Sequence, residues 1–499
     1  MPPQEAGEPT PPAPPAGGQS PDLLDTPQAG PTVIRGGTIR TLGYVAGILM
    51  SAAATPLMIR HLGVVDFGRY VTVTSIITIV AALTDVGLTN IGVREYTLRP
   101  AGERQRLMGN LLGMRMALTV VGAAAAIGFA ALAGYTHVVV LGTVLASIGL
   151  ILQVAQTTYQ VPLSSELKLS LITVLEFTRQ LITVLFIVAL VVVGARLLPF
   201  YLITVVAGVI VLVMNMVIVA RRTTLVPTFE WPEWTRLVRD APAYAVASAI
   251  GFIYFRIEVV LVSLISSGRQ IGFFSASFRI VEIISGIPLL ASLSVFPLMA
   301  KAAHDDRDRF RYMLDRMFQA YAIAGIAVAV AFILGAPVAI DVLAGGGFGP
   351  SVPVLRIMGG SLAATFLVSN WGFALLAVRR HAALMLANLG ALALAIGLTL
   401  ALSPAHGALG AAIALAVTEV ALATTYALLL YGPGSDLRVS FAKVPMMLGA
   451  AGVGIGAGFA SGLPSAPATI LGLVLYAGLL LVTKSIPEEA IQAFRGGGA

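Results

Sequence analysis

The sequence predicts an all-α polytopic membrane protein with about 14 transmembrane helices. Hydrophobic residues make up 57% of the 499 residues and charged residues 11%, whereas a soluble domain has about 25% charged residues. Apolar stretches of about 20 residues, the length needed to cross a hydrocarbon core of ~30 Å, follow one another from Thr38 to Thr483. Basic residues also gather in every second connection, as expected for alternating cytoplasmic and outward loops.

The chain begins with a segment that cannot form a core. Residues 1–34 are rich in proline, glycine and alanine, and this composition predicts a disordered cytoplasmic tail. We expect no cleavable signal peptide, because the first basic-then-apolar pattern starts at Arg35 and continues into a full-length span.

The spans divide into a group of six and a group of eight. The predicted spans are 38–59, 70–92, 108–133, 137–161, 171–194, 198–220, 241–265, 273–298, 314–335, 353–377, 382–402, 408–431, 443–462 and 467–483. The linker 221–240 separates the two groups. In it, Trp231, Trp234 and Leu237 can share one helical face, which predicts an amphipathic helix in the cytoplasmic membrane interface.

The distribution of basic residues predicts the orientation. One set of alternate connections holds about 23 Lys and Arg residues and the other set 5. The positive-inside rule places the basic set, both termini included, in the cytoplasm. The net charge of +7 then indicates contact with an anionic inner leaflet, not with nucleic acid.

Several classes of chemistry find no support in the sequence. There are no cysteines, and the five histidines lie in different loops without metal-ligand spacing. No loop exceeds about 25 residues, so we expect no soluble catalytic domain. There is no Gly-rich phosphate loop ending in Lys-Ser/Thr. We therefore expect no enzyme activity, no metal and no cofactor.

The two groups of spans show a short internal similarity. Residues 63–70 (GVVDFGRY) follow the first span, and residues 268–274 (GRQIGFF) follow the seventh. Aligning Gly68 with Gly272 places both glycines in a turn on the same side of the membrane. This alignment indicates a parallel repeat about an axis normal to the membrane.

A series of motifs resembles the bacterial polysaccharide-biosynthesis flippases, which belong to a superfamily with peptidoglycan-precursor flippases and multidrug extruders. The motifs are residues 60–70 (RHLGVVDFGRY), 83–88 (LTDVGL), Arg94-Glu95, Arg256-Ile-Glu258, 271–276 (IGFFSA), 279–282 (RIVE), Pro297 and 346–350 (GGFGP). The sequence departs from many relatives at Glu258, where they carry aspartate.

The resemblance implies two six-helix lobes, residues 35–220 and 241–431, around a central cavity. Two further helices in 432–484 lie outside the lobes and are followed by the tail 485–499. It also implies a bacterial cytoplasmic-membrane transporter of undecaprenyl-diphosphate-linked oligosaccharide, with polysaccharide polymerase or assembly proteins as further partners.

Charged residues inside spans are costly and therefore need a reason. Arg256 lies in the middle of its span, where it either faces a cavity that receives diphosphate or forms an interhelical ion pair. Arg179 and Arg279 stand three residues from Glu176 and Glu282, so each is either neutralised locally or contested by an anionic substrate. Together with Arg40, these arginines are the predicted diphosphate-binding residues.

Two further groups of polar residues are candidates. Asp85, Glu258 and Glu419 are candidates for ion coupling, although Asp85 could instead pair with Arg94 or Arg40. Gln153, Gln156, Thr157 and Gln160 form a stripe on one helix face that either solvates sugars or bonds another helix.

The function predicted from these observations is a flippase that works by alternating access, without ATP. A multidrug antiporter would need a more acidic cavity, and a membrane-embedded polyprenyl-sugar enzyme would need a large outward loop or an acidic catalytic pair.

Overall fold

A computed structural model describes residues 29–85, 87–219, 226–239, 243–432, 437 and 439–485. The described residues form helices and connections, without β-strands. Eleven helical segments in this part of the chain are long and apolar enough to cross a membrane. Each predicted span overlaps a helix of the structure, although the span 70–92 crosses from the helix Ala29–Asp85 into the helix Leu88–Leu98. The prediction of an all-α membrane protein is confirmed.

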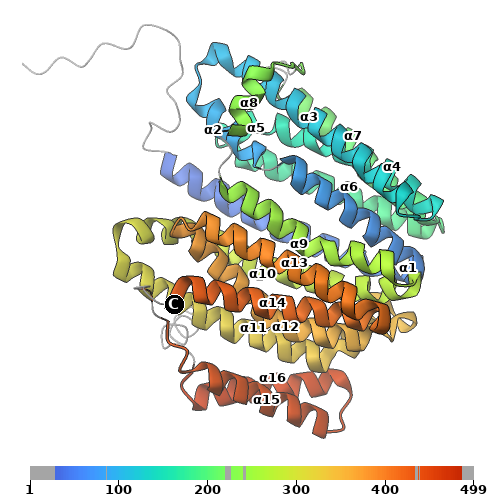
Figure 1. Ribbon diagram of the computed structural model, residues 1–499, viewed down its shortest axis with the longest axis vertical. Helices are drawn as coiled ribbons and strands as arrows, with labels where there is room; N and C mark the ends of the chain where they lie inside the picture. Colours follow the sequence, from blue (N-terminus) through green and yellow to red (C-terminus); the bar gives the residue numbers. More distant parts are fainter. Residues whose placement is uncertain are drawn as a thin grey trace, which may run out of the picture.

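The first half of the chain forms the upper part of Figure 1. Its first helix breaks at Gly63, where φ is 70° and ψ is −177°, so that two segments correspond to the first two predicted spans. Glycine accommodates this backbone conformation without a Cβ penalty. The helices of this half are α1 (Ala29–Asp85), α2 (Leu88–Leu98), α3 (Ala101–Leu132), α4 (His137–Tyr159), α5 (Val161–Ser165), α6 (Leu169–Val192) and α7 (Leu197–Val219).

The second half lies below the first in Figure 1, with the last two helices at the lower edge. Its helices are α9 (Ala243–Ile265), α10 (Gly268–Asp305), α11 (Arg307–Ala344), the 3-10 turn η2 (Gly346–Phe348), α12 (Ser351–Ala377), α13 (His381–His406), α14 (Ala408–Tyr431), α15 (Val444–Ala460) and α16 (Ser465–Val482).

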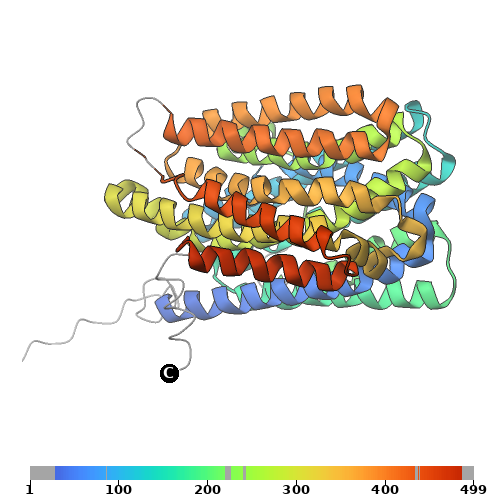
Figure 2. The same cartoon turned by 90° about the horizontal axis from the view of Figure 1, so that it is seen from below.

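Two helices extend well beyond the spans predicted for them. α10 and α11 are each 38 residues long, or about 57 Å at 1.5 Å per residue, and their joined ends project from the bundle in Figure 2. Asp306 separates them and caps α11, because its carboxylate accepts a hydrogen bond from the Arg309 N–H at 2.9 Å. Part of the connection expected between these two spans is therefore helical.

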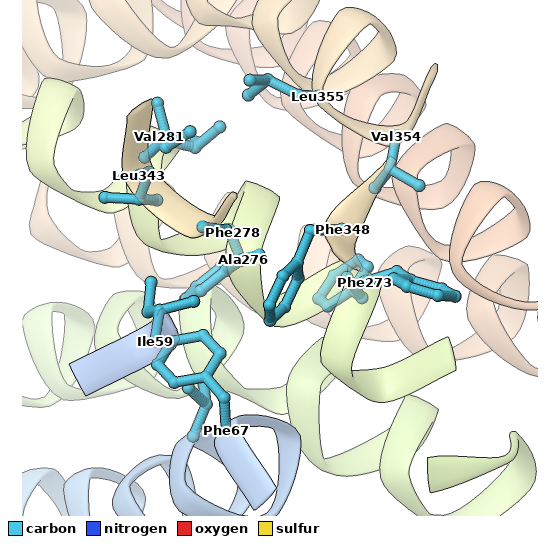
Figure 3. Close-up of a cluster of buried hydrophobic side chains, with 14 of the residues drawn as sticks. Ile59, Phe67, Phe273, Ala276, Phe278, Val281, Leu343, Phe348, Val354 and Leu355 are labelled. Carbon is cyan, nitrogen blue, oxygen red and sulfur yellow. The ribbon is translucent and has the colours of Figure 1, made fainter. Parts of the chain in front are cut away.

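A buried apolar cluster joins the two halves. Ile59 and Phe67 of α1 pack with Phe278 of α10 in a cluster that also includes Phe348 and Leu355, as Figure 3 shows. α1 packs against both α9 and α10. This contact region positions the site described below.

The linker contains the predicted amphipathic helix, α8 (Trp231–Arg239). Trp234 and Leu237 pack against the core of the first half, whereas Trp231 is 72% exposed. Trp231 therefore does not pack with this core, and its ring centroid lies 6.4 Å from that of Trp234.

Polar contacts hold the linker against α3. The Thr228 N–H donates to the Gly109 carbonyl at 3.0 Å, and the Arg106 guanidinium binds the Glu230 carboxylate. The hydrogen bond from Arg106 lowers the pKa of Glu230 below its usual value. The linker is thus fixed to the first half by backbone and ionic contacts together.

Candidate functional site

A polar cavity of about 140 Å³ lies between the two halves of the chain. Four helices line it: α1 and α6 from the first half, α9 and α10 from the second. Its lining residues are Thr55, Met58, Phe67, Tyr70, Val71, Thr74, Gln180, Thr183, Ile187, Arg256, Phe278, Arg279 and Glu282.

Two arginines share one carboxylate in this cavity. Arg279 Nη1 lies 2.7 Å from one oxygen of Glu282, and Arg256 Nη2 binds the other oxygen. The side chains are 15% exposed for Arg256, 20% for Glu282 and 29% for Arg279. Two cations and one anion leave a formal charge of +1 on this group, which favours an anionic ligand.

The surrounding side chains supply an aromatic surface and hydroxyl groups. The guanidinium carbon of Arg256 lies 5.6 Å from the centroid of the Phe278 ring, within the range of a cation–π interaction. Thr55, Thr74 and Thr183 line the same cavity. The cavity can therefore offer charge, hydrogen bonds and an aromatic face to one ligand.

The other two predicted arginines are placed differently. Arg179 is half-buried and does not line the cavity, although its neighbour Gln180 does. No ion pair joins Arg179 to Glu176 among the described residues, and Glu176 is exposed. The i, i+3 spacing allows such a pair but does not force it, because each side chain can turn to solvent. The side chain of Arg40 lies outside the described residues.

The glutamine stripe on α4 is divided between different environments. The Gln156 amide is buried and donates to the Gly208 carbonyl of α7 at 2.6 Å, which is the interhelical bond that the sequence left open. Gln153 is exposed and Gln160 is half-buried at the end of α4. None of the three lines the cavity.

Asp85 pairs with Arg115 rather than with Arg94. Its Oδ1 lies 2.7 Å from Arg115 Nη2 and also accepts from the Thr89 hydroxyl. Arg115 is 3% exposed and also donates to Thr158 at 2.8 Å. Arg115 is one of the about 23 basic residues that the sequence assigns to the cytoplasmic connections, and this assignment is wrong for it. It lies inside α3, where its carboxylate partner offsets the cost of burial.

Glu258 and Glu419 form a second buried group, between α9 and α14. Glu419 accepts hydrogen bonds from the Tyr254 hydroxyl at 2.8 Å and the Thr365 hydroxyl at 2.9 Å. Glu258 is fully buried, and within the described residues neither of its oxygens has a hydrogen-bond partner. Tyr254 stands four residues before Glu258 on α9, so Glu258 lies on the side of α9 that faces Glu419. An unpaired buried carboxylate such as Glu258 is costly unless it takes up a proton or a cation.

A profile described as "Polysaccharide biosynthesis protein" matches residues 33–303, more than half of the chain. The chain belongs to the polysaccharide biosynthesis protein family. A search of curated proteins gives no match.

Solved structures show that this family member shares its fold with known transporters. A structure titled "Lipid II flippase MurJ, inward closed conformation" matches with a TM-score of 0.75 at 10% identity, covering 89% of this chain and 98% of that one. An inward-facing multidrug resistance MATE family transporter matches with a TM-score of 0.63 at 11% identity, covering 77% of this chain and 93% of that one. The TM-scores establish similarity of fold, and at such low identities similarity of fold is all that the matches establish.

Sequence reasoning missed several cavity residues of this family member, namely Tyr70, Thr74, Gln180 and Thr183. Tyr70 and Thr74 are four residues apart, and Gln180 and Thr183 are three apart. Both spacings place side chains on one helix face. Polar pairs at this spacing in otherwise apolar spans were the available signal.

Proposed function

We propose that this protein is a flippase. It moves undecaprenyl-diphosphate-linked oligosaccharide from the inner to the outer leaflet of the bacterial cytoplasmic membrane by alternating access. The halves 35–220 and 241–431 are the moving lobes, with both termini in the cytoplasm. Transport makes and breaks no covalent bond, so the protein is not an enzyme. Polysaccharide polymerase or assembly proteins would take up the product.

The observation that carries this proposal is the shared carboxylate of Glu282 between Arg256 and Arg279. A guanidinium binds phosphate oxygens through paired N–H donors. A diphosphate can therefore replace Glu282 as the partner of both arginines, because it offers more acceptor oxygens and more negative charge. Replacing Glu282 in this way breaks its ion pair with Arg256, so substrate entry changes the contact between α9 and α10.

Family membership and fold support the transport part of the proposal. The lipid-linked substrate is supported by the structural similarity to a lipid II flippase, together with the net positive charge of the cavity group. Arg179, Arg40 and the α4 glutamines remain predicted sugar or diphosphate contacts, reached in other conformations of the two lobes.

The membrane potential can supply the driving force. Moving one negative charge outward across an inside-negative membrane gains about 2.3 kcal/mol per 100 mV. The buried carboxyl groups of Glu258 and Glu419 provide a second route, in which a proton or cation binds and is exchanged during the cycle. Asp85 is a weaker candidate for this role because Arg115 already neutralises it.

The test is lipid mass spectrometry of cells depleted of this protein, complemented with wild type, Arg256→Gln or Arg269→Gln. Arg269 is the matched control, since it lies at the start of α10 and is exposed. We expect one undecaprenyl-diphosphate oligosaccharide to accumulate in the inner leaflet of depleted cells. Wild type and Arg269→Gln should clear it, and Arg256→Gln should not. No accumulation would overturn the proposal.

One observation favours a second candidate, a cation-coupled multidrug extruder of the same superfamily. The buried carboxyl groups of Glu258 and Glu419 suit cation exchange, and a MATE transporter shares the fold. Depleted cells would then become sensitive to organic cations without accumulating a polyprenyl-linked sugar.

A further inference from the structure

A groove lies on the outer face of α13 and α14, away from the cavity between the two halves. Its volume is about 460 Å³, within the range of about 300–1,000 Å³ typical of ligand pockets. Small and aliphatic side chains form its walls. They are Ala383, Leu386, Ala387, Gly390, Ala391, Leu394, Ala421, Leu422, Thr425 and Leu429. None of these residues lines the cavity between the halves.

The groove is open to the outside of two apolar helices of membrane-spanning length and offers almost no polar group to a ligand. Leu386 on its wall is 64% exposed, and no atom lies within 4 Å of the Cβ position of Gly390. The Thr425 hydroxyl donates to the Ala421 carbonyl at 2.8 Å, so its one donor is already used within the helix. Such a surface fits a flexible alkyl chain.

One end of the groove is positively charged. Arg380 Nη1 donates to the carbonyl of Leu429, a groove residue. Arg379 precedes α13, is exposed, and makes no ion pair or hydrogen bond through its side chain within the described residues. Its φ of 58° is unusual for a residue other than glycine. This end belongs to the connection that the positive-inside rule places in the cytoplasm.

The length of the groove matches one leaflet. Ala383 and Leu394 are separated by 11 residues along α13, which corresponds to ~16 Å at 1.5 Å per residue. Half of a hydrocarbon core of ~30 Å is ~15 Å. An acyl chain of the inner leaflet therefore fits its length, whereas a polyprenyl chain would extend past it.

We infer that the α13–α14 groove is a binding site for an anionic glycerophospholipid of the inner leaflet. One acyl chain lies along Gly390 between the two helices, and the phosphate lies at Arg379 and Arg380. This site is separate from the proposed substrate cavity, and it does not depend on the substrate being a lipid-linked sugar. A lipid bound here fills the groove between α13 and α14. Of these two helices, α14 carries Glu419.

The test is native mass spectrometry of the full-length protein in detergent, titrated with phosphatidylglycerol or phosphatidylethanolamine of identical chains. Three variants complete it: Gly390→Leu fills the groove, Arg379→Gln removes the charge, and Gly397→Leu is the matched control. Gly397 also lies on α13 with open space at its Cβ position, but it does not line the groove.

We expect wild type and Gly397→Leu to retain phosphatidylglycerol in preference to phosphatidylethanolamine. Retention of phosphatidylglycerol should fall about fivefold in Arg379→Gln, as expected for loss of one interfacial cation, and at least as much in Gly390→Leu. Arg379 is exposed, so its variant stays informative even if Gly390→Leu does not fold.

The inference would be overturned by any of three results: equal retention of the two lipids by the wild type, no loss of retention in Arg379→Gln, or equal loss in Gly390→Leu and Gly397→Leu. So would a preference for undecaprenyl phosphate over phosphatidylglycerol.

Discussion

Gly68 of α1 and Gly272 of α10 pack backbone against backbone where the two halves of the chain meet. A Cβ atom on Gly68 would lie 2.8 Å from the Gly272 nitrogen, and one on Gly272 would lie 2.0 Å from the Val64 carbonyl oxygen. These are the two glycines that the internal similarity aligns with each other. Both glycines lie within helices, near the start of the second segment of α1 and of α10, and not in the turns that the sequence predicts. The equivalent helix starts of the two halves are therefore in direct contact, and the absence of side chains allows it.

Gly272→Ala should disfavour this contact between the halves. Its methyl group would meet backbone rather than a movable side chain, and overpacking of this kind costs about 1–3 kcal/mol. The chain contains no cysteine, so a Val65→Cys/Gly268→Cys pair can report the contact. A Cβ on Gly268 would lie 3.4 Å from Val65 Cγ1. We expect slower oxidative cross-linking of this pair when Gly272→Ala is added.

Gly128→Ala is the control for that measurement, because no atom lies within 4 Å of its Cβ position in α3. It should leave the cross-linking rate unchanged. If the two glycine variants cross-link at equal rates, the close approach of Gly68 and Gly272 does not determine how the halves meet.

Arg256→Gln should weaken the binding of undecaprenyl diphosphate in detergent by about 10- to 100-fold. A hydrogen bond to a charged group contributes about 1.5–3 kcal/mol.

Glu282→Gln should act in the opposite direction on binding, because it frees Arg256 and Arg279 from their shared carboxylate. It should still slow transport, since the arginines would then hold the anion without a competitor. Binding titrations and vesicle flux assays measure the two effects, with Arg269→Gln as the control. Tighter binding to Arg256→Gln would contradict the assignment.

Asp85→Ala should destabilise the first half by about 3 kcal/mol, the lower part of the range for breaking a buried ion pair. Arg115 is 3% exposed and would lose its carboxylate partner, while Asp85 itself is 38% exposed. Thermal unfolding in detergent measures the loss. Asp308→Ala, which removes a carboxylate that is 90% exposed, should have little effect. An unchanged melting temperature together with altered ion dependence of transport would return Asp85 to the ion-coupling candidates.

The helices were predictable because each span must satisfy its backbone hydrogen bonds internally and expose apolar side chains to lipid. Hydropathy therefore located them from composition alone. Hydropathy could not show that α10 and α11 continue past the bilayer, because the sequence 299–313 is polar and the Asp306 cap that organises it is a local hydrogen bond.

Contacts between helices were much harder to predict. Arg256 and Glu282 are separated by 26 residues and lie on different helices, so helical spacing identified only the local pair of Arg279 and Glu282. Arg115 follows the more exposed Arg104 and Arg106 on α3, and its burial depends on a contact with Asp85, 30 residues away. Such partners depend on how helices rotate against one another, which a single sequence does not specify.

The two tryptophans of α8 should respond differently to substitution. Trp234 packs against the core of the first half, so Trp234→Ala should cost about 3 kcal/mol of stability. Trp231 is 72% exposed, and Trp231→Ala should change stability by less than about 0.5 kcal/mol.

If α8 lies in the membrane interface, brominated lipids should quench Trp231 fluorescence. Quenching should then fall in Trp231→Phe and persist in Trp234→Phe, because the remaining tryptophan, Trp371, is buried. Equal quenching in wild type and Trp231→Phe would place α8 away from the bilayer.

Glu258→Gln should stabilise the protein and remove its response to a coupling ion. The Glu258 carboxyl is fully buried without a hydrogen-bond partner within the described residues. Binding of a proton or Na⁺ relieves the cost of this unpaired buried charge, so ion binding should raise the melting temperature of the wild type. We expect the wild type to melt at a higher temperature at pH 6 than at pH 8 if the ion is a proton. If the ion is Na⁺, melting should respond to NaCl but not to KCl. Glu258→Gln should melt above the wild type at pH 8 and show neither response. Asp308→Gln, far more exposed, controls for general charge effects. A wild type insensitive to both ions would remove Glu258 and Glu419 from the transport mechanism and leave the membrane potential as its driving force.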